Sequence, residues 1–136
     1  MAANHTPIRV VIVTMDTHLV SATERARFAL QKKMPGLVLT IHAASSWTVD
    51  AKALKACVDD IARADIVVAM MLFMEDHFLP VIDALKARRL ECDAMVCAMS
   101  AAEIVTLTHM GSFNMSKPAT GLMALLKRLR GNKEKA

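Results

Sequence analysis

One apolar run near the middle of the chain constrains the fold most. After Asp65 the sequence reads Ile-Val-Val-Ala-Met-Met-Leu-Phe, and it then changes abruptly to Met74-Glu75-Asp76-His77. An unbroken run of this kind is typical of a strand that is buried on both faces of a parallel sheet. Open α/β sheets bind their ligands beyond the carboxyl ends of the strands, so the polar cluster marks where a function is expected.

Further apolar runs alternate with helical patterns along the chain. Strands are expected at Ile8–Thr14, Leu37–Ala43 and Ala94–Met99, with a helix over Asp50–Arg63 that Asp50 caps. The second strand alternates more weakly and is therefore placed near a sheet edge. This alternation of strands and helices predicts an α/β, Rossmann- or flavodoxin-like three-layer sandwich with a four-stranded parallel sheet in the order 2-1-3-4.

Local signals predict where several helices begin. Ser21–Glu24 and Ser100–Glu103 both have the spacing of a capping box. After the first of these, Ala22, Ala26, Ala29 and Leu30 form the expected inner face of a helix. Pro80 is expected in the first turn of the helix after the central run, where its missing N–H costs little.

The chain divides into four parts. Residues 1–7 form a flexible arm, 8–108 the α/β domain, 109–118 a connection without a strand, and 119–136 a basic amphipathic helix and tail. The apolar stripe of that helix follows the spacing i, i+3, i+4 and i+7 and consists of Leu122, Leu125, Leu126 and Leu129. Because no fifth strand is expected, the fourth strand should be an exposed sheet edge unless another segment covers it.

Composition narrows the class of protein. With 54% hydrophobic and 22% charged residues among 136, the chain is expected to fold as one globular unit. The net charge of +4 resides mainly in the terminal helix, and aromatic residues are only 4%, so nucleic-acid recognition is not expected. The three cysteines form no CxxC pair, and no signal peptide or bilayer-length apolar run occurs, which predicts a cytoplasmic protein without a transmembrane segment.

The common catalytic motifs are missing from the sequence. It contains neither G-x-G-x-x-G nor the P-loop pattern, so nucleotide binding is not expected. It also lacks H-E-x-x-H and G-x-S-x-G, the usual signatures of zinc proteases and serine hydrolases. The chain alone is therefore not expected to be a catalyst, and no catalytic residue is assigned.

The candidate ligand-binding residues follow the first and third strands. They are Asp16, His18, Glu75, Asp76 and His77. If the two strands are neighbours, these carboxylates and imidazoles can converge to hold a polar ligand, shuttle protons or bind a metal ion. Each carboxylate is equally suited to capping the helix that follows it, which is the commoner role at such positions. We assign no metal site.

Four stretches of the sequence resemble one known family. They are Arg9–Leu19, Ala64–Val68, Met71–Pro80 and Cys92–Ser100, and Gly121–Gly131 is also similar. Together they resemble the amino-terminal domain of the large, porphyrin-binding H subunit of magnesium chelatase over nearly the whole chain. Cobaltochelatase large subunits are the nearest relatives, and the Met-Glu-Asp-His segment favours the magnesium enzyme.

The resemblance implies a role in chlorophyll or bacteriochlorophyll synthesis, in which the H subunit holds protoporphyrin IX while Mg²⁺ is inserted. Its implied partners are the remainder of the H subunit, an AAA+ ATPase that hydrolyses ATP, and an adaptor subunit. The family's H subunit is much longer than this chain, and its chelation centre is expected mainly elsewhere. We therefore carry over the pathway and the complex, with Mg²⁺, protoporphyrin IX and ATP as cofactors of the whole complex.

Two other functions remain open from the sequence. The chain is alternatively a docking module that recruits a partner through an exposed sheet edge and its basic helix, without touching porphyrin. A free-standing flavodoxin-like binding domain is the third hypothesis. It fits less well, because Met15-Asp16-Thr17-His18 places an acid where a flavin site needs a phosphate-binding loop.

Overall fold

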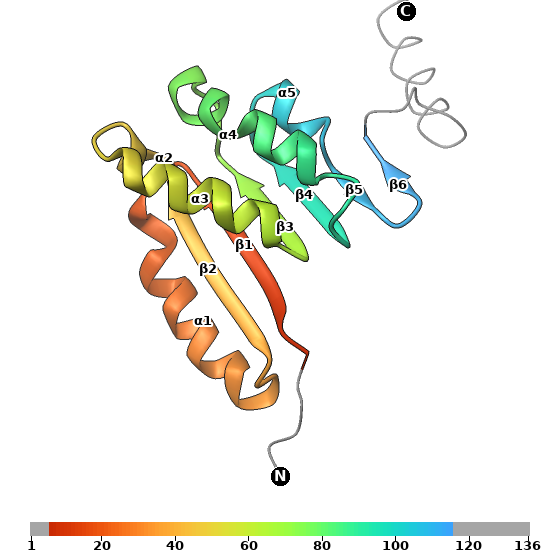
Figure 1. The fold of residues 1–136 in the computed structure, drawn as a ribbon. Coiled ribbons are helices and arrows are strands. Elements are labelled where there is room, and N and C mark those ends of the chain that lie inside the picture. Colours follow the sequence, from red (N-terminus) through yellow and green to blue (C-terminus); the bar gives the residue numbers. More distant parts are fainter. Residues whose placement is uncertain (1–5, 116–136) are drawn as a thin grey trace, which may run out of the picture.

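The computed structural model describes residues 6–115, and it has the alternation of strands and helices that the sequence predicts (Figure 1). The strands are β1 (Ile8–Thr14), β2 (Leu37–Ala43), β3 (Ile66–Met70), β4 (Ala94–Ala98), β5 (His109–Met110) and β6 (Phe113–Asn114). The helices are α1 (Val20–Lys33), α2 (Ala44–Trp47), α3 (Ala51–Arg63), α4 (Glu75–Arg88) and α5 (Ala102–Val105), and a 3-10 turn (Thr17–Leu19) precedes α1.

The strands form one sheet in the order β2-β1-β3-β4-β5-β6. Its first four strands are parallel, so the predicted order 2-1-3-4 and the edge position of β2 are confirmed. The expectation of no strand after Thr108 is wrong, because β5 and β6 extend the sheet in antiparallel fashion. Each has two residues, too few for the alternation of apolar and polar residues to be recognised.

The hairpin of β5 and β6 covers the edge of β4 that was expected to be exposed. Gly111 and Ser112 form its loop, and Gly111 has φ of +55°, which a glycine adopts without steric cost. Thr108 anchors the hairpin: its buried hydroxyl accepts a hydrogen bond from the Cys97 N–H and donates one to the Cys97 carbonyl, both at 3.0 Å. The sheet-edge argument for a docking module therefore does not hold for β4.

Helix starts differ from the sequence expectation in three places. Neither predicted capping box forms: Leu19 and Ala101 are the N-cap residues of α1 and α5, and neither side chain makes a capping hydrogen bond. Pro80 lies beyond the first turn of α4, because that helix begins at Glu75. By contrast, Asp50 caps α3 as predicted by accepting a hydrogen bond from the Lys52 N–H at 2.9 Å.

The inner face predicted for α1 is also wrong. Ala22, Ala26, Ala29 and Leu30 are exposed, and Thr23 is the one buried residue of the helix. The helix contacts the sheet mainly through β2, the edge strand. Alanine spacing alone did not distinguish the flank that packs from the neighbouring flank, because both carry small or apolar residues.

The hydrophobic core lies between the sheet and the helices α3 and α4. Ile61 of α3, Val67 of β3 and Leu85 of α4 are fully buried in it. The central run is buried on one face only, since Val67 and Ala69 are buried whereas Ile66, Val68 and Met70 are partly exposed. The expected burial of both faces is therefore not found in the described part of the chain.

The amphipathic helix predicted over 119–136 and most of the arm over 1–7 lie outside the described residues. Among residues 6–115, no helix combines the length and hydropathy that crossing a bilayer requires.

Candidate functional site

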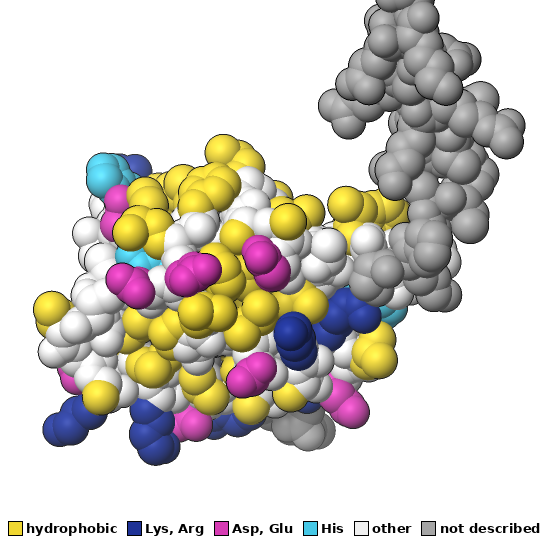
Figure 2. All heavy atoms as spheres, turned by 90° about the horizontal axis from the view of Figure 1, so that it is seen from above, with side chains coloured by type: hydrophobic (Ala, Val, Ile, Leu, Met, Phe, Trp, Pro, Cys, Tyr) yellow, Lys and Arg dark blue, Asp and Glu magenta, His cyan; other side chains and the backbone are white. Residues whose placement is uncertain are grey.

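The carboxyl edge of the parallel strands gathers all five predicted site residues. Asp16 and His18 follow the end of β1, and Glu75, Asp76 and His77 form the start of α4 after β3. Strands β1 and β3 are direct neighbours, so both groups lie at the same edge of the sheet, as predicted. Figure 2 looks onto this side of the molecule and shows acidic side chains among many exposed apolar ones.

Asp16 and His18 form a local pair. The Asp16 carboxylate accepts a hydrogen bond from the His18 backbone N–H at 3.0 Å and lies 2.7 Å from His18 Nδ1. The backbone hydrogen bond is the main reason that the pKa of Asp16 is lowered, and the His18 side chain adds to it. Asp16 thus caps the 3-10 turn before α1, which supports the structural role considered for it.

Glu75 and Asp76 do not cap α4. Met74 is the N-cap residue, and the helix start has no side-chain capping bond. Both carboxylates are exposed in the first helical turn, where the partial positive charge of the helix end stabilises them. Within the described residues they make no hydrogen bond or ion pair, so they are available to a ligand.

The loops after β3 and β4 are bonded to each other. The Ser100 hydroxyl accepts a hydrogen bond from the Leu72 N–H and donates one to the Ala98 carbonyl, each at 3.0 Å. The Met71 N–H donates to the Met99 carbonyl at 2.8 Å. Ser100, expected to start a helix, instead fixes the shape of the carboxyl edge beside the first turn of α4.

Three buried polar atoms at this edge have no hydrogen-bond partner in the described chain. They are Thr14 Oγ1 at the end of β1, Trp47 Nε1 in α2 after β2, and His77 Nδ1 in α4 after β3. Helix α2 packs against both α3 and α4. Buried polar atoms are rarely unpaired, so each of these three atoms is expected to bind a water molecule or a ligand. Thr14, the polar end of the first apolar run, and Trp47, the one tryptophan, are residues that the sequence reasoning missed.

Large apolar side chains are exposed at the same edge. Phe73 and Met74 precede α4 with 57% and 56% of their surface exposed, Leu79 in α4 has 54%, and Met99 after β4 has 64%. We call these four residues the apolar rim. Met15, which directly follows β1, is partly exposed. Neighbouring apolar and acidic groups suit a ligand that has a flat apolar body and polar substituents.

The described residues contain no group of three or more His, Cys, Asp or Glu side chains that could hold a metal ion. The two carboxylate–imidazole groups therefore share an edge without forming a closed set of metal ligands.

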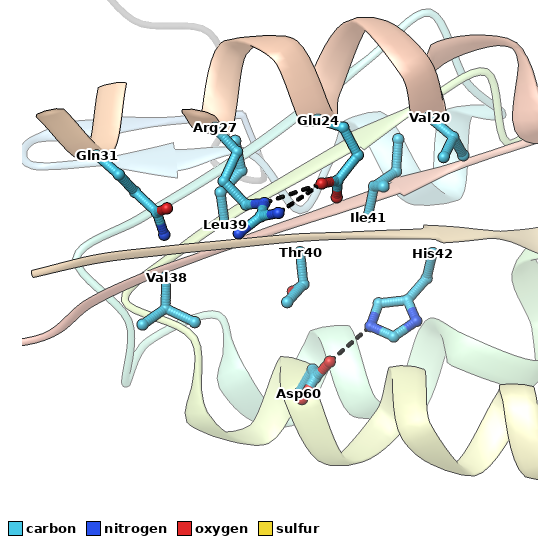
Figure 3. Close-up of a pocket in the computed structure, with 10 residues that line it drawn as sticks. All are labelled: Val20, Glu24, Arg27, Gln31, Val38, Leu39, Thr40, Ile41, His42 and Asp60. Atoms are coloured by element: carbon cyan, nitrogen blue, oxygen red, sulfur yellow. Dashed lines mark hydrogen bonds and ion pairs between the residues drawn. The ribbon is translucent and has the colours of Figure 1, made fainter. Parts of the chain in front are cut away.

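Away from the carboxyl edge, a hollow lies along the outer side of β2, between α1 and α3 (Figure 3). Its volume is about 510 Å³, and two charged pairs flank it: His42 Nε2 is 2.7 Å from Asp60 Oδ2, and Arg27 is 2.6 Å from Glu24. Asp60 also binds Arg63, at 3.2 Å. The His42–Asp60 pair connects the edge strand to α3, so its role is to hold that helix against the sheet.

Comparison with known proteins gives a consistent result. The family described as "Domain of unknown function (DUF3479)" matches residues 9–136. The magnesium-chelatase H subunit of Cereibacter sphaeroides is 47% identical over 122 residues, which is 90% of this chain and 10% of that protein. The magnesium-chelatase H subunit of Rhodobacter capsulatus is 40% identical over 125 residues, which is 92% of this chain and 10% of that protein. The chain thus spans about a tenth of the length of the curated relatives that it matches.

Proposed function

The chain belongs to the DUF3479 family and matches the amino-terminal region of the magnesium-chelatase H subunit, and from this we propose that it serves in the insertion of Mg²⁺ into protoporphyrin IX. The observation that carries the proposal is the identity of 47% and 40% to two H subunits across at least 90% of this chain. In this proposal the chain acts as one domain of a porphyrin-binding subunit in chlorophyll or bacteriochlorophyll synthesis.

The remaining parts of the reaction belong, in this proposal, to the rest of the complex. The sequence has no P-loop, so ATP hydrolysis is assigned to a partner of the AAA+ class and assembly to an adaptor subunit. A cytoplasmic location fits the three free, buried cysteines.

The site that we propose for the tetrapyrrole is the carboxyl edge. The apolar rim offers a surface for a flat apolar macrocycle, because burying its exposed side chains against a ligand removes apolar area from water. Metal insertion also releases two pyrrolic protons, which His18 and His77 are suited to accept. Glu75 and Asp76 supply the oxygen ligands that Mg²⁺ prefers.

A porphyrin titration tests this proposal. The 136-residue chain is titrated with a water-soluble protoporphyrin analogue while porphyrin absorption and the fluorescence of Trp47 are followed, with serum albumin as a reference for non-specific binding. Trp47 is the one tryptophan and lies in α2 at the carboxyl edge, so a porphyrin bound there should quench its emission. Saturable quenching is the expected result.

Two pairs of variants locate the binding surface. His77→Gln should weaken binding about tenfold if it contributes one hydrogen bond of about 1.4 kcal/mol. Its control is His109→Gln, because His109 Nδ1 is also buried without a hydrogen-bond partner among residues 6–115 but lies on β5. Phe73→Ser should likewise weaken binding, whereas Phe28→Ser on α1, also strongly exposed, should not.

Absence of saturable binding by a folded chain would overturn the assignment of porphyrin to this domain and favour the docking role. Equal losses in the test and control variants would show that binding is not located at the carboxyl edge.

A further inference from the structure

The two faces of the sheet are covered unequally. On the face toward α3 and α4, Val13, Val67 and Met95 have no exposed surface. Side chains alternate between the faces of a strand, so their neighbours point to the other face. Apart from Thr14, which is buried, these neighbours are partly exposed. We call this second surface the open sheet face, and its residues are Val10, Ile12, Ile66, Val68, Met70 and Val96.

The strand register makes the open sheet face continuous. Val10 lies beside Ile66, Ile12 beside Val68, and Val68 beside Val96, so the patch crosses β1, β3 and β4 without interruption. All six side chains are apolar, and five of them belong to residue types that are usually buried in the centre of a parallel sheet. These strands therefore carry an apolar surface that residues 6–115 leave partly exposed to water.

Helix α1 borders this surface but does not cover it. Figure 3 shows α1 and α3 on opposite sides of β2, with Glu24 on the flank of α1 that faces the hollow beside the outer edge of β2. Successive helical residues are about 100° apart, so Ala22, Ala26 and Ala29 lie on the flank of α1 opposite Glu24, away from the hollow. All three alanines are exposed. Because α1 lies on the side of the sheet away from α3, it borders the open sheet face, and we call the space between them the apolar corner.

We propose that the chain's own segment 119–131 seats in this corner as a helix, with Leu122, Leu125, Leu126 and Leu129 against the open sheet face. These four leucines form one apolar stripe at helical spacing. The basic residues Lys127 and Arg128 lie off the stripe and stay in water.

The dimensions agree with this placement. A helix over 119–131 is about 20 Å long, and a strand of five to seven residues spans about 17–23 Å. The described chain ends beside Thr108, where the Met115 N–H donates to the Thr108 carbonyl at 3.1 Å. From β6 to β3 is three strand spacings, about 14 Å, and the five peptide units from Asn114 to residue 119 reach about 16–18 Å.

A spin label tests the placement in the whole chain. Lys127→Cys carries the label beside the leucine stripe without replacing a leucine. The native thiols resist labelling, since burial raises the pKa of Cys57 and of Cys97 to about 12 and also raises the pKa of the buried Cys92. With methyl-labelled protein, the Ile12, Ile66 and Val68 methyl signals are expected to be broadened more strongly than the Val13 and Val67 signals on the covered face.

Control variants separate docking from other causes of signal loss. Leu125→Ser with Leu126→Ser in the labelled chain should restore the open-face signals, whereas Lys133→Ser should not. Moving the label to Lys55, exposed on α3, should instead affect the covered face. Methyl spectra recorded after chemical reduction of the spin label show that each variant is folded.

Two results would overturn the proposal. Unchanged open-face signals in the folded, labelled chain would mean that the segment does not dock there. Signal loss that arises only between a spin-labelled molecule and a separate methyl-labelled one would assign the open sheet face to a second copy of the chain.

Discussion

Met71 and Met99 adopt backbone conformations that residues other than glycine rarely take. Their φ angles are +60° and +47°, and the Met71 N–H is bonded to the Met99 carbonyl. A left-handed conformation costs an L-residue about 1–2 kcal/mol. Strain of this kind is often located at functional sites, and here both residues lie in loops at the carboxyl edge.

Replacing Met99 with glycine should stabilise the fold. Met99 is 64% exposed, so its side chain contributes little packing, and relief of strain should exceed the added chain entropy of glycine. We expect Met99→Gly to raise the free energy of unfolding by about 0.5–1 kcal/mol in urea titrations. Met99→Ala is the matched control, because it removes the side chain but keeps Cβ. An equal gain in both variants would show that strain is not the cause.

Asp16 should titrate below its usual range. Because its pKa is lowered in the folded chain, its contribution to stability is present above the unfolded pKa and is lost as the pH falls through the folded pKa. His18→Ala should leave the pKa of Asp16 still lowered, since the hydrogen bond from the backbone N–H remains. Carboxyl carbon shifts measured by NMR against pH test this, and a return of the pKa to its ordinary value in His18→Ala would contradict it.

At the scale of elements, the hairpin of β5 and β6 depends on one buried side chain. Thr108 replaces a strand pairing by bonding both backbone groups of Cys97. Thr108→Val preserves the shape but leaves those two groups unpaired, which should lower the free energy of unfolding by about 2 kcal/mol. Thr106→Val is the control. Thr106 is exposed, and its hydroxyl donates to the Glu103 carbonyl in the same turn of chain, so its replacement should change stability by about 0.5 kcal/mol or less. The free energy of unfolding of both variants is measured by urea titration. An equal decrease in the two would contradict a special role for Thr108.

The elements were predictable where apolar runs were long. β1 and β2 have the expected bounds, and α3 has the expected cap at Asp50. The hairpin was missed because its strands are short, although Gly111-Ser112 between His109-Met110 and Phe113-Asn114 is a recognisable hairpin signal. The capping boxes failed because Ser21 lies inside α1, and the Ser100 hydroxyl bonds to the loop after β3 instead.

For the whole molecule, the sequence predicted the location of the candidate site better than its contents. The order of the parallel strands follows from right-handed crossovers, and that order places Asp16 and Glu75 at one edge. Thr14 and Trp47 were not predicted, because their importance depends on hydrogen bonds that they fail to make, and no residue pattern reports such a deficit. The roles of the five site residues in binding remain predictions.

The two edges of the sheet differ in how well they can pair with a further strand. β2 has seven residues and no neighbouring strand on its outer side in the described chain, whereas β6, at the opposite edge, has two residues. Leu37 shows which backbone groups of β2 face outward, because its N–H donates to the Met34 carbonyl and its carbonyl accepts from the Gln31 side chain. Backbone groups alternate in direction along a strand, so those of Leu39 and Ile41 face outward as well. An incoming strand would thus find a template of useful length on one side only, and sheet-mediated self-association of this domain would join molecules in pairs rather than extend into fibres.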